Sequence, residues 1–129
     1  MEYNILQLNT KRSWAAKNLL DQHMAENNIA LAIISEPPQI KKSGDWLISK
    51  DGMAAMHWNQ DLTTCILVEK GIDYVIVETM GIHIVSYYGS PNKKAGEFEA
   101  SLLRLQGSLD RHKNARTLLA GDFNARLKM

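Results

Sequence analysis

The sequence predicts a mixed α/β fold, and three observations lead to this class. A strand-like segment near the N-terminus is followed by a capped helix and then by a short apolar run, 29–34. Three runs rich in β-branched residues come next with short turns between them, which favours an antiparallel meander. A second amphipathic helix then leads into a last strand, 116–120. Together these elements predict strands packed against helices.

Length and composition restrict the class of protein further. The chain has 129 residues, of which 45% are hydrophobic and 22% charged, and its formal net charge is +1. This is enough apolar material to bury one core, so we expect a folded domain. The near-neutral charge does not by itself indicate a nucleic-acid partner. The single cysteine, Cys65, excludes a disulfide framework, and we expect it to be a buried apolar side chain in a reducing compartment.

Neither a membrane span nor a secretory signal is visible in the sequence. No stretch approaches the roughly 20 consecutive apolar residues that a spanning helix needs. The N-terminus also lacks the basic start of a signal peptide. We therefore expect an intracellular protein with no membrane partner.

The first part of the chain is predicted to form a strand, a helix and a second strand. Residues 5–9 alternate and end on a polar residue, which places Asn9 at the carboxyl end of a strand. Ser13 can cap a helix that extends to about residue 28. The run 29–34 stops at two prolines and predicts a strand buried on both faces, parallel to the first. The helix side expected to face the sheet carries Trp14, Leu20, His23, Met24 and Asn27.

The second part of the chain is predicted to be richer in strands. Residues 39–51 predict a loop that holds at most a short strand, 46–48. The meander is predicted from the runs 62–68, 74–77 and 82–88. A helix over 95–113 is indicated by apolar residues at spacings of four, three and four, namely Phe98, Leu102, Leu105 and Leu109.

Polar side chains follow four of the predicted strands at their carboxyl ends. In open α/β layers the loops beyond strand ends meet at one edge, so residues far apart in sequence can converge there. We therefore expect one polar cluster. Its candidate members are Asn9, Glu36, Tyr88, Asp122 and Asn124.

Glu36 is the candidate metal ligand in this cluster. It follows a buried strand and precedes Pro37 and Pro38, which stiffen the loop and restrict where the carboxylate points. Mg²⁺ prefers oxygen ligands and is commonly held by one or two carboxylates, waters and substrate phosphate. A loop carboxylate that caps nearby amides is the alternative, and Glu36 alone does not decide between them.

The segment 121–124 offers a base and an amide on one face. Asp122 and Asn124 lie two residues apart and point the same way, whereas Phe123 points into the core. An aspartate can orient or deprotonate a water, and an asparagine can donate to a phosphate oxygen. A plain Asx turn explains the same residues.

Tyr88 is the candidate among the two adjacent tyrosines, because side chains alternate along a strand and Tyr88 is the last residue before the turn. Its phenol could bond a phosphate, and the alternative is a buried tyrosine with a satisfied hydroxyl. The four histidines show no metal-ligand spacing, and we expect each to be structural or solvated.

In their order along the chain, these motifs resemble the endonuclease/exonuclease/phosphatase superfamily. They are Asn9, Ser35-Glu36-Pro37, Ser86-Tyr87-Tyr88-Gly89-Ser90-Pro91 and Gly121-Asp122-Phe123-Asn124-Ala125. More narrowly, the stretches 8–16 and 32–37 resemble the apurinic-type endonuclease domain of non-LTR retrotransposons. The resemblance extends from Ile5 to Arg126 and implies a four-layer α/β sandwich of the DNase I-like type, of which only the N-terminal half is present.

This resemblance implies a role for each candidate. Glu36 would be the principal ligand of Mg²⁺, with Mn²⁺ as an alternative ion, and Asn9 would assist at the metal and the phosphate. Asp122 would orient the attacking water, Asn124 would bind the scissile phosphate, and Tyr88 would lie beside it. The implied reaction is metal-assisted hydrolysis that nicks one strand of a DNA substrate. It would leave a 3′ hydroxyl from which the element's reverse transcriptase primes, which implies a nuclear location.

Two departures from that family are visible. Lys11 stands where the branch usually has a second asparagine, and it could contact a phosphate as a point charge. The family's later aspartate and its terminal Ser-Asp-His-type motif are absent. We therefore interpret residues 1–129 as the N-terminal part of a truncated domain, whose missing half would precede a downstream reverse transcriptase. Alone it should be nearly inactive and expose an edge prone to aggregation or dimerisation.

Two other interpretations stay open. One is a phosphatase or nuclease of the same superfamily that acts on another phosphate ester. The other is an inactive remnant that keeps the fold but performs no reaction.

Overall fold

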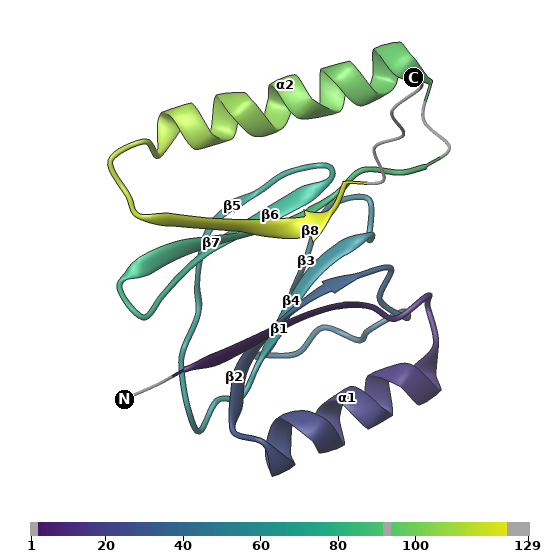
Figure 1. The fold of residues 1–129 in the computed structure, drawn as a ribbon, viewed down its shortest axis with the longest axis vertical. Coiled ribbons are helices and arrows are strands. Elements are labelled where there is room, and N and C mark those ends of the chain that lie inside the picture. The colour runs from purple at the N-terminus through teal and green to yellow at the C-terminus, as the bar shows by residue number, and fades with distance from the viewer. Residues whose placement is uncertain (1–2, 92–93, 124–129) are drawn as a thin grey trace.

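The computed structural model describes residues 3–91 and 94–123. One four-stranded sheet has the order β1 (Asn4–Asn9), β2 (Ile29–Ser35), β4 (Ala54–Trp58) and β3 (Trp46–Ile48). The other has the order β5 (Ile66–Lys70), β6 (Tyr74–Thr79), β7 (Ile82–Tyr88) and β8 (Thr117–Asp122). The helix α1 (Trp14–Glu26) covers the outer face of the first sheet, and α2 (Ala95–Arg111) covers that of the second (Figure 1). The predicted α/β fold class with four layers is thus confirmed.

The first sheet begins with the predicted crossover. β1 and β2 are parallel neighbours, and every residue of β2 is buried. The Ser13 hydroxyl accepts a hydrogen bond of 3.1 Å from the Ala16 N–H and so caps α1. α1 packs on the sheet through Leu20 and Met24. The prediction that a broader face of α1 packs on the sheet is wrong, because Trp14 is 52% exposed and the side chains of residues 23 and 27 also lie at the surface.

The second sheet contains the predicted meander. β5, β6 and β7 pair antiparallel, and β8 then adds to β7 in parallel after α2. β5 begins at Ile66, four residues later than expected. β4 was not predicted, because its residues Ala-Ala-Met-His-Trp contain no β-branched side chain and do not alternate. Pairing with β2 and β3 nevertheless makes it a strand.

An apolar layer joins the two sheets. Along β2, Leu31 and Ile33 face the second sheet, whereas Ala32 and Ile34 pack toward α1. The layer is completed by Met56, Trp58, Val75, Val77 and Ile84. Because these side chains fix one sheet on the other, the carboxyl ends of β1 and β8 reach the same side of the molecule (right in Figure 1).

The edge strands β1 and β8 lie beside each other. The Gln7 side-chain N–H donates a hydrogen bond of 2.7 Å to the Gly121 carbonyl oxygen and so connects one sheet edge to the other. On β8, Leu118 and Leu119 are 39% and 38% exposed. An exposed apolar edge was expected, while dimerisation or aggregation through it stays a prediction. Neither described helix is both long and apolar enough to cross a membrane.

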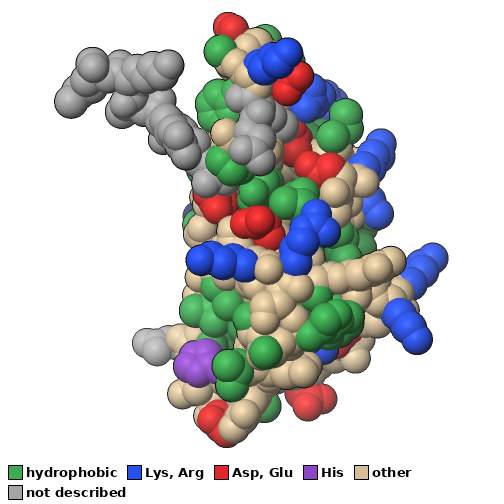
Figure 2. Space-filling model, turned by 90° about the vertical axis from the view of Figure 1, so that its right-hand side faces the viewer, with side chains coloured by type: hydrophobic (Ala, Val, Ile, Leu, Met, Phe, Trp, Pro, Cys, Tyr) green, Lys and Arg blue, Asp and Glu red, His purple; other side chains and the backbone are tan. Residues whose placement is uncertain are grey.

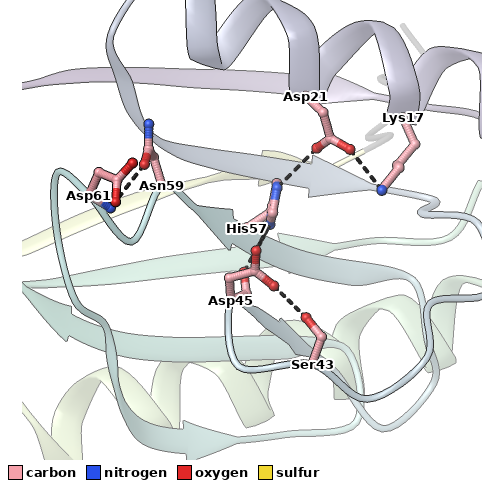
Figure 3. A network of polar contacts seen from close by, with 7 residues as sticks. All are labelled: Lys17, Asp21, Ser43, Asp45, His57, Asn59 and Asp61. Atoms are coloured by element: carbon pink, nitrogen blue, oxygen red, sulfur yellow. Dashed lines mark hydrogen bonds and ion pairs between the residues drawn. The ribbon is translucent and has the colours of Figure 1, made fainter.

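A polar network attaches α1 to the strand pair β3–β4 (Figure 3). His57 lies with Nε2 3.0 Å from an Asp21 carboxylate oxygen and Nδ1 2.9 Å from the Asp45 carbonyl oxygen. Trp46 stacks on the imidazole with 4.4 Å between ring centroids, and Lys17 pairs with Asp21 at 2.7 Å. These contacts give His57 a structural role.

Two acidic residues attach α2 to the second sheet. Asp73 is fully buried and accepts hydrogen bonds from the Ser101 hydroxyl and, at 3.0 Å, from Arg104. At the C-terminal end of α2, Glu69 accepts from Arg111 at 2.6 Å and, within the sheet, from the Tyr74 hydroxyl. The helix is therefore held by ionic contacts at its middle and at its C-terminal end as well as by its apolar side.

The acid stability of the fold should depend on Glu69. Burial raises the pKa of this carboxyl, but hydrogen bonds from Arg111, Tyr74 and His112 outweigh burial and lower it to about 2. Since the folded-state pKa lies below the ordinary value, the stabilisation is present above about pH 4.5 and is lost as the pH falls toward 2. We expect Glu69→Gln to lower the free energy of unfolding at pH 7 and to flatten its decline over that range, as measured by urea unfolding.

The matched control is Glu78→Gln, which removes an exposed carboxylate on β6. Equal pH dependence of unfolding in the two variants would contradict the role given to Glu69.

Candidate active site

The Asn9 side chain joins the two sheets at their common end. Its amide N–H group donates to the Glu36 carboxylate and, at 3.3 Å, to the Asp122 carboxylate. Its amide oxygen accepts the Lys11 N–H at 2.7 Å, which fixes the orientation of the amide. Gln7 lies on the same face of β1, two residues earlier, and its bond to β8 holds the edges together at this point. Residues predicted from three separate strand ends therefore meet at Asn9.

Glu36 lies in a tightly bonded turn directly after β2. Its φ of +50° places a non-glycine residue in the left-handed region, which costs roughly 1 kcal/mol or more. The Glu36 N–H donates to the Met53 carbonyl at 2.8 Å, and its own carbonyl accepts from the Arg12 N–H at 2.7 Å and the Thr10 hydroxyl at 2.8 Å. These three bonds offset the strain and direct the carboxylate toward Asn9.

Tyr88 and Asp122 are brought together by strand pairing. They are register partners on the parallel strands β7 and β8, and the Gly89 N–H donates to the Asp122 carbonyl at 2.7 Å. Tyr88 is 3% exposed, and its N–H donates to the Asp73 carbonyl at 3.0 Å. The expected alternation is confirmed, since Tyr87 packs with Leu105 of α2 instead.

The electrostatics of the site act on the Tyr88 hydroxyl. Burial raises its pKa above the ordinary value, and the negative charges of Glu36, Asp122 and Asp51 raise it further, against the opposing effect of Arg12. The phenol therefore keeps its proton at neutral pH and can donate a hydrogen bond.

Two neighbours of Tyr88, Asp51 and Arg12, were not predicted as site residues. Asp51 lies in the turn between β3 and β4, where its carboxylate accepts from the Ser49 hydroxyl at 2.6 Å and the Met53 N–H at 2.9 Å. The Asp-Gly sequence indicates a turn, but its position beside the site depends on β4, which the sequence pattern does not reveal.

The remaining candidate, Asn124, lies outside the described residues, so its role stays a prediction. Figure 2 shows the side of the molecule on which the strand ends lie, with acidic side chains near its middle and Lys and Arg side chains bordering them. A groove of about 1070 Å³ lies elsewhere, along α1, and is lined by none of the four candidates that the structure describes.

The donor set fits a hard divalent cation. The Glu36 and Asp122 carboxylates converge on one amide, and all three side chains carry oxygen. Within residues 3–91 and 94–123, no three or more His, Cys, Asp and Glu side chains form a metal cage. Mg²⁺ does not require one, because it keeps several waters and accepts one or two carboxylates together with substrate phosphate.

Comparison with known proteins was made on sequence and on structure. No protein-family model and no curated protein matches the sequence. Among solved structures, the endonuclease domain of TRAS1, a telomere-specific non-LTR retrotransposon, matches 98% of this chain with a TM-score of 0.77 and 26% identity. The chain has the DNase I-like fold of the endonuclease/exonuclease/phosphatase superfamily. It spans 61% of the length of the TRAS1 domain.

Two more distant structures share this endonuclease/exonuclease/phosphatase fold. A humanized D. rerio TDP2 with 14 mutations matches 97% of the chain at a TM-score of 0.62 and 12% identity, with 63% of its own length covered. A functionally unknown conserved protein from Enterococcus faecalis V583 matches 98% at a TM-score of 0.59 and 14% identity, with 68% covered. At such identities the likeness concerns the fold alone.

Gly121 is required for the approach of β8 to β7. Its φ is +144°, and a Cβ atom there would lie 1.9 Å from the Tyr87 carbonyl oxygen. We expect Gly121→Ala to lower the free energy of unfolding by about 2–4 kcal/mol, because backbone must move beside Asp122. The control Gly107→Ala adds a methyl in the interior of α2, where the nearest atom is 3.6 Å away, and should be neutral or stabilising. Equal unfolding midpoints in urea would contradict this account.

Titration of Tyr88 tests whether the Glu36 carboxylate lies close to the Tyr88 hydroxyl. Glu36→Gln removes one of the anions that raise the Tyr88 pKa, so the pKa should fall. Tyrosinate absorbance against pH measures it, and Tyr88→Phe identifies which transition belongs to this residue. A Tyr88 titration unchanged by Glu36→Gln would show that the two side chains do not face each other.

Proposed function

We propose that this chain is the N-terminal part of an Mg²⁺-dependent endonuclease that nicks DNA for a non-LTR retrotransposon. The fold match supports a nuclease or phosphodiesterase function at the level of the superfamily. The observation that carries the finer proposal is the Asn9 amide, which bridges the Glu36 and Asp122 carboxylates beside a buried tyrosine. The likeness to the TRAS1 endonuclease domain supports DNA as the substrate.

Each described side chain has a task in this proposal. Glu36, with Asn9 assisting, holds Mg²⁺, which when bound supplies positive charge that polarises the phosphodiester. Asn9 also keeps the two carboxylates in place through its N–H bonds. Asp122 accepts a hydrogen bond from the attacking water and so directs its oxygen at the phosphorus. Tyr88, which keeps its proton, donates to a non-bridging phosphate oxygen.

The reaction breaks the bond between phosphorus and the 3′ oxygen. Water supplies the new oxygen on phosphorus, and the 3′ oxygen leaves with a proton as a hydroxyl from which a reverse transcriptase could prime. The contribution of the protein is to position water and phosphate and to stabilise the charge that builds on oxygen. In this proposal Asn124 binds the phosphate as well.

The proposal includes a C-terminal part that completes the domain. The chain spans 61% of the TRAS1 domain, and the exposed leucines of β8 offer an apolar edge for further packing. A downstream reverse transcriptase and a nuclear location belong to the same proposal.

Magnesium binding provides the first test. A ligand that binds only the folded state at 100 times its Kd stabilises that state by about 2.7 kcal/mol. We expect saturating Mg²⁺ to raise the thermal midpoint of the wild type and of the control Glu78→Gln, and to leave that of Glu36→Gln unchanged. Equal shifts in all three proteins would refute Glu36 as the ligand, and no shift in any would favour an inactive remnant.

Supercoiled plasmid provides the second test. Mg²⁺-dependent nicking that is lost in Glu36→Gln and kept in Glu78→Gln would support the endonuclease and would contradict the expected inactivity of the chain alone. Hydrolysis of an inositol phosphate without nicking, by a domain completed with its C-terminal part, would favour the phosphatase alternative.

A further inference from the structure

Backbone strain is concentrated where the loop after β1 contacts Glu36. Among the described non-glycine residues, five have positive φ, and three of these belong to this junction. They are Lys11 at 49°, Arg12 at 59° and Glu36 at 50°. Two consecutive left-handed residues with long cationic side chains are costly, so the surrounding bonds must enforce this conformation.

The strained loop is fixed by two bonds to the site and by one within the loop. The Arg12 N–H donates to the Glu36 carbonyl and the Lys11 N–H to the Asn9 side chain, both at 2.7 Å. Within the loop, the Ser13 N–H donates to the Thr10 carbonyl at 2.9 Å. Any movement of this loop would therefore move Asn9 or Glu36. The loop holds the Arg12 backbone at a set position relative to both carboxylates.

The Arg12 side chain is held without a carboxylate partner among the described residues. Its guanidinium contacts the Met53 sulfur at 2.8 Å, and a thioether is only a weak acceptor. The two arginines of α2 differ, since Arg104 and Arg111 each bind a carboxylate. Arg12 thus keeps most of its five donors for a ligand, and its own N–H is bonded to the Glu36 carbonyl at 2.7 Å.

We propose that Arg12 binds a backbone phosphate of the DNA substrate next to the phosphate that is cleaved. The inference rests on the proposed function. A guanidinium offers a planar pair of N–H donors that matches two phosphate oxygens, which an ammonium cannot do. The guanidinium contacts Met53, whose carbonyl accepts the Glu36 N–H, so this group lies next to the turn that carries Glu36 and can meet a phosphate that flanks the scissile one. The strained loop then presents an arginine that has no carboxylate partner within residues 3–91 and 94–123, and it does so beside Glu36.

The test is the salt dependence of DNA binding by the whole chain. Affinity for a short fluorescent duplex is measured without Mg²⁺ over a range of salt concentrations, using anisotropy. Each lost phosphate contact reduces the slope of log affinity against log salt by about 0.9. We expect Arg12→Gln to reduce the slope by that amount and to weaken binding about tenfold at low salt.

Two further variants separate charge from geometry. Arg12→Lys keeps the charge but not the paired donors, so it should keep the slope and bind several-fold more weakly. Arg116→Gln removes an exposed arginine that precedes β8, at the far end of that strand from Asp122, and should match the wild type. Urea unfolding of each variant shows whether it is folded, and Arg12→Lys carries the test should Arg12→Gln fail to fold.

The outcomes are distinguishable. A wild-type slope in Arg12→Gln, or equal losses in Arg12→Gln and Arg116→Gln, would overturn the role of Arg12 and leave the proposed function in place. Wild-type affinity in Arg12→Lys would overturn the paired contact. Absence of any salt-dependent binding by the wild type would overturn DNA as the substrate, and this inference with it.

Discussion

The apolar layer between the two sheets determines where everything else lies. Leu31 and Ile33 on one side meet Val75, Val77 and Ile84 on the other, and all five are buried. Interiors of this kind are close-packed, so a shift of one sheet along the other would open voids along the whole interface. The ends of β1, β2, β7 and β8 are therefore kept in fixed relation by contacts far from any polar group, and the site can be built from single residues at those ends.

The polar cluster at these ends combines rigid support with carboxylates that lie close together. Glu36 is held through its backbone, which leaves the carboxylate to interact with Asn9 rather than with the amides around it. This observation disfavours the capping role that the sequence left open. The carboxylates raise the pKa of one buried phenol, that of Tyr88, and the guanidinium of Arg12 lowers it. Such an arrangement costs stability in the protein alone and is typical of sites that complete their charge balance with a ligand.

Much of the fold could be predicted, because the spacing of hydrophobic residues indicates strands and helices and the turn residues indicate where they end. β2 and β7 are examples, since an unbroken apolar run and an alternating β-branched run predict their limits closely. β4 could not be predicted in this way. Its alanines and methionine have no strand preference, and it is a strand because β2 and β3 provide hydrogen-bonding partners on both sides. The position of Asp51 beside the site was missed for the same reason, because the turn that carries it is placed there by β4.

The sequence predicted which residues would lie at the site, but it did not predict which of them would contact one another. Strand ends indicated that Asn9, Glu36, Tyr88 and Asp122 would share one edge, and the structure brings them together. That Asn9 would donate to both carboxylates depends on the distance between two sheet edges, which no local pattern encodes. Trp14 illustrates the opposite error, because helical spacing put it on the buried face although only one narrow strip of α1 reaches the sheet.

The contact between Asn9 and Asp122 joins residues 113 positions apart. Contacts of such separation require the closure of a long loop, and they form late in folding because their entropy cost precedes any gain in packing. β1 and β2 can assemble with α1 early, because their contacts are local in sequence. β8 can pair with β7 only after the intervening α2 has been placed. During synthesis the same order applies in time, because Asn9 and Glu36, 27 positions apart, both leave the ribosome well before the strand that bears Asp122.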